Sequence, residues 1–254
     1  MLVIGTNKTD TILEHLPESY LLIDDGAVID ALALPKRRKV TRLNFSHHSF
    51  NPLTGMDYYK ARQLIAIFGA VFPEGANTLT KKNSDYALLK ALLRNKTRTL
   101  DTLIAPSKDP TQQDAYQKID TLLLSPILRR VLCNPTNFSM RGIVIARLDR
   151  AMMDDFDCFV LGNLLISAYP GPVVIPDFGF YAIPHHIQLI RQNRLVAGLN
   201  VLDEVPAAIR QQLLLMHPKL GHRCTFDDAE ILAQYAGIPR GTNAHTDFIA
   251  AAMR

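Results

Sequence analysis

The chain has 254 residues, of which 48% are hydrophobic and 20% are charged, and its formal net charge is +4. This composition excludes a disordered chain, and the length suffices for one large α/β domain. Three scattered cysteines favour reduced thiols in a cytoplasmic protein over a disulfide framework. The apolar runs are too short to span a bilayer, and the N-terminus MLVIGTNKTD lacks the features of a signal peptide.

The first part of the chain alternates predicted strands and helices. Residues 2–5 predict a short strand, 6–16 an amphipathic helix, and 20–26 a second strand that ends in two acids and a glycine. This compact β-α-β spacing favours a parallel sheet. A helix over 27–34 and a third strand over 39–45 follow, and they lead into the loop HHSFNPLTG.

Residues 55–135 predict helices throughout. The expected helices are 59–72, a segment capped by Asn83 or Ser84, a short one from Thr99, one over 115–124 after a polar linker at 107–113, and one that restarts at Ser125-Pro126. We interpret this block as a helical insertion in a single domain that spans residues 1–254.

The second half returns to the α/β pattern. Residues 142–148 and 172–178 are nearly continuous apolar runs, as in strands buried on both faces of a sheet, and 159–169 predict the helix between them. The remaining expected elements are a helix over 185–192, a strand over 194–200, a helix over 205–216, a strand over 222–226, a helix from Thr225 to Gly237 and a tail helix over 247–254. The predicted fold class is α/β with a mainly parallel central sheet.

Asp177 ends the predicted strand 172–178 and is followed by Phe178 and Gly179. An aspartate at this place can bind Mg²⁺ through water, and it can equally cap a turn or helix. The nearby acids Asp149, Asp154, Asp155 and Asp157 are more typical of a solvated loop and a helix cap than of a metal site. A zinc site with His222 and Cys224 is conceivable, but the spacing fits no closed zinc pattern.

The order of these parts resembles the additional-strand P-loop ATPases of the HerA/FtsK type, which include conjugative coupling proteins and phage genome-packaging ATPases. The resemblance rests on LLIDDG at 21–26, on FNPL at 50–53 and on the strand-helix-strand unit at 141–181. It implies a RecA/P-loop fold that binds ATP and Mg²⁺, with Asp177 as the catalytic and metal-binding acid. It further implies Asn200 as a sensor, Arg191 and Arg194 as candidate arginine fingers, and a phosphate loop made of Gly5, Thr6, Asn7, Lys8, Thr9 and Thr11.

The sequence departs from this family at two motifs. The pattern G-x-x-x-x-G-K-[ST] supplies backbone N–H groups and a lysine to the phosphates. Counted from Gly5, its last three positions are Asp10, Thr11 and Ile12, and an ordinary strand-helix turn explains this stretch equally well. An active ATPase usually has a glutamate after the metal-binding aspartate, where this chain has Phe178.

Three functional hypotheses follow from these motifs. The first is a degenerate P-loop ATPase-like protein of a DNA-translocation or genome-packaging system, with weak or absent ATP hydrolysis. The second is an active ATP-dependent motor subunit of the same lineage. The third is an unrelated α/β phosphoryl-transfer enzyme that uses Asp24, Asp25 and Asp177.

Basic residues gather in two places that could contact the phosphates of double-stranded DNA. Lys36, Arg37 and Arg38 belong to one run, and Lys90 and Arg94 belong to a basic stretch over 81–98. A solvated basic face is the alternative. The resemblance implies a homo-oligomer or a ring shared with a paralogue, located in the cytoplasm or, for a viral protein, associated with the virion.

Overall fold

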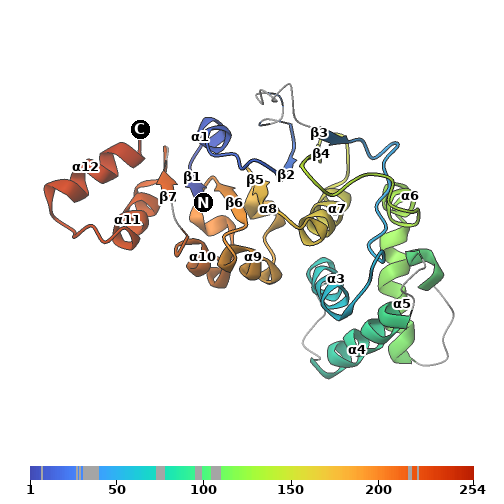
Figure 1. Cartoon of the computed structure of the whole chain (residues 1–254). Helices are drawn as coiled ribbons and strands as arrows, with labels where there is room; N and C mark the ends of the chain where they lie inside the picture. The colour runs from blue at the N-terminus through green and yellow to red at the C-terminus, as the bar shows by residue number, and fades with distance from the viewer. Residues whose placement is uncertain are drawn as a thin grey trace. The chain divides into compact units, whose positions relative to one another are not determined.

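The structure is a computed structural model of the whole chain. It describes residues 1–6, 8–26, 28, 30, 40–72, 78–94, 99–103, 110–216, 219–221 and 223–254 (Figure 1). The chain divides into two compact units. The first contains Met1–Arg42, Arg141–Asp149 and Gly171–Arg254, and the second contains Leu43–Met140 and Arg150–Pro170.

A sheet with the strand order β3-β4-β2-β5-β6-β1-β7 is the centre of the first unit (Figure 1). The strands β4, β2, β5, β6, β1 and β7, which are neighbours in this order, are all parallel. This confirms the predicted α/β fold with a mainly parallel sheet. The strands are β1 (Leu2–Ile4), β2 (Tyr20–Asp24), β3 (Val40–Leu43), β4 (Ile143–Arg147), β5 (Val173–Ile175), β6 (Leu195–Leu199) and β7 (Lys219–Gly221).

The central strands of this sheet are apolar over most of their length because both of their faces are covered. Every residue of β2 and of β6 is buried, as the continuous apolar runs predict for a parallel sheet. Val3 of β1, Ile12 of the first helix, Leu22 of β2 and Val174 of β5 belong to one buried cluster, which also includes residues of β4 and β6. Burial of each such side chain contributes roughly 1.5–3 kcal/mol.

The first two strands are not neighbours in the sheet, although a compact β-α-β unit was expected at residues 2–26. β1 pairs with β6 and β7, and β2 pairs with β4 and β5. Two later strands therefore lie between them. The sequence indicates the parallel direction correctly, but local spacing carries no information about which strands insert later.

The helices of the first unit are short, and each follows a strand or a turn. They are α1 (Lys8–Glu14), α8 (Phe178–Tyr181), α9 (Ile187–Arg191), α10 (Ala207–Leu213), α11 (Phe226–Tyr235) and α12 (Asn243–Ala252), with 3-10 turns η2 (Pro184–His186) and η3 (Leu202–Glu204). The helix predicted over 27–34 lies largely outside the described residues.

The last strand was predicted at 222–226, and this prediction is wrong. The edge strand β7 ends at Gly221 instead. Arg223 has a positive φ of 50°, which is incompatible with an extended strand, and the Thr225 hydroxyl accepts a 3.2 Å bond from Asp228 N as the N-cap of α11. Capping by Thr225 thus competes with strand formation in the residues just before the helix.

The described residues of the predicted insertion form helices joined by turns, without a strand among them. The helices of the second unit are α3 (Tyr58–Val71), α4 (Thr78–Arg94), α5 (Pro110–Leu123), α6 (Pro126–Leu132) and α7 (Asp155–Ala168), with the 3-10 turn η1 (Leu100–Leu103). Ser125 caps α6 as expected, since its hydroxyl accepts a 3.2 Å bond from Leu128 N.

Three helix starts in this unit differ from the prediction. Asn83 and Ser84 lie inside α4 and cannot cap it. α5 begins at Pro110, within the expected linker, because proline is well suited to a first helical turn. α7 begins at Asp155, four residues early, because Asp154 accepts a 2.7 Å bond from Phe156 N, which confirms a capping role for one of the clustered acids.

The loop with the sequence FNPL at residues 50–53 has a structural role. Phe50 N donates to Val131 O at 2.9 Å, and Asn51 Oδ1 accepts from Leu53 N at 2.9 Å. Phe50, Asn51 and Leu53 are all buried. These bonds tie the loop to the end of α6 and close its own turn, so the motif serves the packing of the second unit.

Candidate functional site

Polar side chains meet at the carboxyl edge of the parallel sheet in the first unit. This is the edge at which open α/β sheets bind ligands. The strands β1, β2, β5 and β6 all end here, and the residues that follow them include Lys8, Asp25, Asp177, Asn200 and Glu204. We call these five residues the edge cluster.

The turn after β1 is shorter than a standard phosphate loop. Gly5 has a φ of 114° and its N–H donates to Leu199 O of β6 at 2.9 Å, so the chain bends sharply at the strand end. α1 begins at Lys8, so its first turn starts with Lys8 and Thr9. Thr6 is exposed beside Gly5, and Asn7 lies outside the described residues.

Counting eight residues from Gly5 places the expected Gly-Lys-Ser/Thr at positions 10–12, and all three of these positions lie inside α1. Asp10 lies within α1, and Thr11 and Ile12 are buried in it. Lys8-Thr9 is the lysine-hydroxyl pair that opens the helix. The sequence signal that could have found it is a Lys-Thr pair three residues after the glycine that ends the first strand.

Lys8 is the cation of the edge cluster. Its Nζ donates to Asn200 Oδ1 at 2.7 Å, so the side chain reaches across from α1 to the end of β6. Burial lowers the pKa of Lys8 below its ordinary value, and the carboxylates of Asp177, Glu204, Asp25 and Asp24 act against that shift. Lys8 is thus near Asp177, at an edge where the eight-residue pattern counted from Gly5 supplies no lysine.

Asn200 and Glu204 form a closed pair after β6. Asn200 N donates to Glu204 Oε2 at 2.9 Å, and Asn200 Nδ2 donates to Glu204 Oε1 at 2.8 Å. Both carboxylate oxygens are therefore held by one residue. Asn200 was predicted as a sensor, whereas Glu204 was missed because its distance from Asp177 along the chain gives no local signal.

Gly179 brings the turn after β5 against Glu204. A Cβ atom on Gly179 would lie 2.7 Å from Glu204 Cβ and 3.0 Å from its Oε2, closer than real side chains approach. Asp177 immediately precedes α8, but its side chain does not cap that helix. The absence of a side chain at position 179 thus lets the segments that carry Asp177 and Glu204 pack directly together.

Asp24 has a different role from the other acids at this edge. It is buried, and its Oδ2 accepts bonds from Gly26 N and Val28 N, both at 2.9 Å. It closes the turn after β2 by satisfying two backbone donors. Asp25, the next residue, is exposed.

The two arginines proposed as fingers lie away from the edge cluster of their own chain. Arg194 precedes β6, so the five residues of that strand, roughly 16 Å, separate it from Asn200. Its Nε and Nη2 donate to Gly171 O at 3.2 and 3.1 Å, and Arg191 Nε donates to Gln212 Oε1 at 3.1 Å. Any role for them as fingers therefore concerns a second subunit.

The predicted DNA-binding residues are partly described. Lys36, Arg37 and Arg38 lie outside the described residues. Lys90 and Arg94 are exposed on α4, four residues apart on one face, and Tyr86, 67% exposed, is one turn before them. Leu88 and Leu92 are buried on the other side of this helix.

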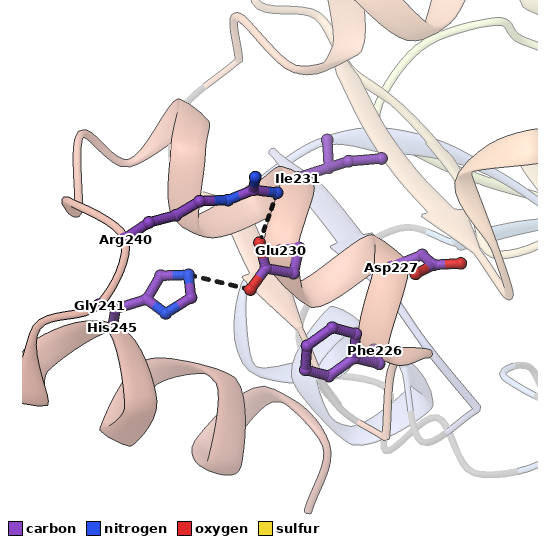
Figure 2. A pocket seen from close by; sticks show the side chains of 7 residues that line it. All are labelled: Phe226, Asp227, Glu230, Ile231, Arg240, Gly241 and His245. Atoms are coloured by element: carbon purple, nitrogen blue, oxygen red, sulfur yellow. Dashed lines mark ion pairs between the residues drawn. The ribbon is translucent and has the colours of Figure 1, made fainter.

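A separate hollow lies in the hairpin of α11 and α12 (Figure 2). Its volume is about 570 Å³, and it is largely open to solvent. Glu230 is its central acid, with Arg240 Nη2 at 2.7 Å and His245 Nε2 at 3.1 Å. The Arg240 and His245 side chains both point at this carboxylate, so residues of the same hairpin already occupy it (Figure 2).

Among the described residues, no three His, Cys, Asp or Glu side chains gather as a metal site of protein ligands alone would require. Cys224 is buried and its thiol donates to Ile4 O at 3.3 Å, as expected of a core cysteine, while His222 lies outside the described residues. In the part of the chain that is described, no helix combines the length and apolarity needed to cross a bilayer.

The chain matches no protein-family model and no curated protein, but it matches solved structures across nearly its whole length. These structures share a RecA/P-loop type of α/β fold with it, as the resemblance predicts. VirB4 of Thermoanaerobacter pseudethanolicus aligns with a TM-score of 0.61 and 13% identity, over 98% of this chain and 83% of that chain.

The conjugative coupling protein TrwB is a second structural neighbour. Its unbound form aligns with a TM-score of 0.57 and 14% identity over 92% of this chain and 72% of that chain. Its complex with ADP and Mg²⁺ aligns with a TM-score of 0.56 and 13% identity over 92% and 73%. At such low identity these likenesses establish the fold alone.

Proposed function

We propose that the chain binds a nucleoside triphosphate, ATP in the first place, together with Mg²⁺ at the edge cluster, and that it serves a DNA-transfer machine. The observation that carries this proposal is the position of Lys8. It opens α1 directly after a shortened turn and reaches Asn200 among the acids of the same sheet edge. A lysine at this place can contact β- and γ-phosphates.

The charges of the edge cluster support a nucleotide that arrives with a metal. Asp25, Asp177 and Glu204 outnumber the single cation Lys8, and a bare triphosphate would be repelled. Carboxylates next to phosphates are suitable Mg²⁺ ligands, and Asp177 and the Thr9 hydroxyl are the groups that would hold the ion. When bound, Mg²⁺ neutralises phosphate charge and polarises the phosphoryl group.

The position of Lys8 favours the hypothesis of a nucleotide-binding, active ATPase over the hypothesis of a degenerate ATPase-like protein. The degenerate hypothesis rests on a missing lysine, and that argument depends on an eight-residue loop. With α1 starting at Lys8, a contracted loop supplies the cation. The third hypothesis, phosphoryl transfer by strand-end aspartates, loses support. It requires Asp24 to act on a substrate, but Asp24 Oδ2 already accepts bonds from the backbone N–H groups of Gly26 and Val28.

The role in DNA transfer rests on the structural neighbours and on the exposed basic face of α4. TrwB is named as a conjugative and plasmid coupling protein. Tyr86, Lys90 and Arg94 form a stripe on which a phosphate backbone could lie. Affinity for arbitrary duplex DNA that falls steeply with salt would support this role. A homo-oligomeric ring, or a ring with a paralogue, belongs to the same proposal.

Calorimetric titration with ATP tests the nucleotide site. We expect binding with Mg²⁺, at least tenfold weaker binding when EDTA replaces Mg²⁺, and at least tenfold weaker binding for Lys8→Ala. Asp10→Asn separates the two loop registers. In the eight-residue register, neutralising Asp10 removes a charge beside the phosphates and tightens binding, whereas in the contracted loop it leaves the affinity unchanged within about twofold. No binding at millimolar ATP with Mg²⁺ would reject the proposal.

A further inference from the structure

The edge cluster contains a carboxylate in a place where the sequence motif has none. After Asp177 comes Phe178, which is fully buried and cannot act on a substrate. We propose that Glu204, supplied by the turn after β6, is the group that polarises the attacking water in ATP hydrolysis. This inference rests on the nucleotide site proposed above and assigns a catalytic residue to it.

Glu204 is held in one orientation. Its two oxygens accept separate bonds from Asn200, one from the backbone N–H and one from the side-chain amide, at 2.9 and 2.8 Å. Asn200 also receives the Lys8 ammonium through its Oδ1 at 2.7 Å. A single residue therefore positions both the cation that would meet the phosphates and the carboxylate that would meet the water.

Glu204 is close to the cation and to the segment that carries the metal-binding acid. Its charge raises the pKa of Lys8, second only to that of Asp177 among the carboxylates that do so. Gly179, two residues after Asp177, lies directly under its side chain. Glu204 is partly exposed, so water can reach it, whereas Asp24 is buried under two backbone donors.

The step that Glu204 would assist is a balanced hydrolysis. The water oxygen forms a bond to the γ-phosphorus while the bond between that phosphorus and the β,γ-bridging oxygen breaks. The proton of the water passes to the Glu204 carboxylate and from there to the released phosphate or to solvent. ADP leaves with the bridging oxygen, and no oxidant, reductant or further reactant is required.

A purely structural role for Glu204 makes different predictions. If the bonds to Asn200 only closed the turn after β6, neutralising Glu204 would lower stability and nucleotide affinity but would leave no specific mark on the chemical step. Asp203 provides a matched control. It is the neighbouring acid on η3, is largely exposed, and pairs with Arg210 instead of with the edge cluster.

The experiment compares the wild-type chain, Glu204→Gln, Glu204→Asp and Asp203→Asn. Binding of ATP with Mg²⁺ is measured by calorimetry and hydrolysis by single turnover. For Glu204→Gln we expect ATP affinity within about threefold of wild type and hydrolysis slower by about 10²–10⁴-fold. Glu204→Asp should recover part of the rate, and Asp203→Asn should match wild type in both measurements.

The outcomes separate this inference from the proposed function. If ATP binds and Glu204→Gln hydrolyses it at the wild-type rate, or if the wild-type chain binds ATP without hydrolysing it, the catalytic role of Glu204 is overturned and the nucleotide site stands. If Glu204→Gln loses ATP affinity in proportion to its rate of hydrolysis, Glu204 has a structural role and the catalytic role is overturned. If the wild-type chain binds no ATP, both proposals fail together.

Discussion

The turn after β2 and the turn after β6 end at the same sheet edge, and each contains a carboxylate within reach of Lys8. In the first, Asp24 is buried and accepts bonds from two backbone N–H groups of its own turn. In the second, Glu204 is partly exposed and is held by Asn200, which also binds Lys8. The two acids thus differ in their hydrogen-bond partners. Asp24 stabilises its own turn, whereas Glu204 remains accessible to water, as the proposed catalytic role requires.

The largest expected effect is on the turn after β2. Asp24→Ala leaves two buried backbone donors without an acceptor, which should lower the free energy of unfolding by about 2–5 kcal/mol. Urea denaturation measures this loss. Asp25→Ala, the exposed neighbour, should change stability by less than about 0.5 kcal/mol. If Asp24→Ala instead kept full stability and abolished hydrolysis, Asp24 would belong to the catalytic set and the contrast between the turns would be lost.

The second effect concerns the turn that packs against Glu204. Gly179→Ala places a methyl group where the Glu204 side chain now lies, so that Glu204 must move. Displacement of a catalytic group by about 1 Å should slow single-turnover hydrolysis by about 100-fold while the affinity for ATP with Mg²⁺ stays within a few fold. In a Glu204→Gln background the same substitution should add little, because the group that it displaces no longer acts. Additive losses would mean that Gly179 acts independently of Glu204.

A third effect depends on pH and concerns the packing behind Asp177. His186 is fully buried, its ring lies 5.8 Å from that of Phe178, and both ring nitrogens lack a hydrogen bond within the described part of the chain. Burial, and less so the neighbouring His185, lower the pKa of His186 to about 3. The folded state therefore keeps this ring neutral, while the unfolded chain takes up a proton as the pH falls below about 6.5.

Stability should consequently decrease as the pH falls from about 6.5 toward 3. For the wild-type chain the contribution of His186 between pH 7 and pH 5 is about 2 kcal/mol, and His186→Leu should remove it. Urea denaturation at the two pH values measures the difference. Equal losses in the wild type and the variant would show that this histidine does not titrate on unfolding, and that the segment after Asp177 is less tightly buried than its packing indicates.

Local patterns predicted the elements of this fold better than their arrangement. Continuous apolar runs identified β2, β4, β5 and β6, because burial on both faces leaves little room for polar residues. Ser125 and Thr225 were correctly identified at helix starts, because capping depends on residues three positions apart.

The site was predicted less completely because its contacts are distant in sequence. Asp177 and Asn200 were predicted from strand ends, and Lys8 was predicted as a member of the phosphate loop without the role of its lysine. Glu204 and the close approach at Gly179 depend on how the turns after β5 and β6 pack, and a single sequence does not encode that in any short motif. The predicted roles of Arg191 and Arg194 stay predictions, because they concern a neighbouring subunit.

The position of β1 has a consequence for how the protein is made. Leu2, Val3 and Ile4 pair with Ala197, Gly198 and Leu199, so β1 is synthesised almost two hundred residues before the strand with which it pairs. Lys8 and Asn200 come together by the same pairing. On the ribosome, the edge cluster can therefore assemble only after β6 has been translated, and a nascent chain that stops before β6 contains Lys8 without its partner Asn200.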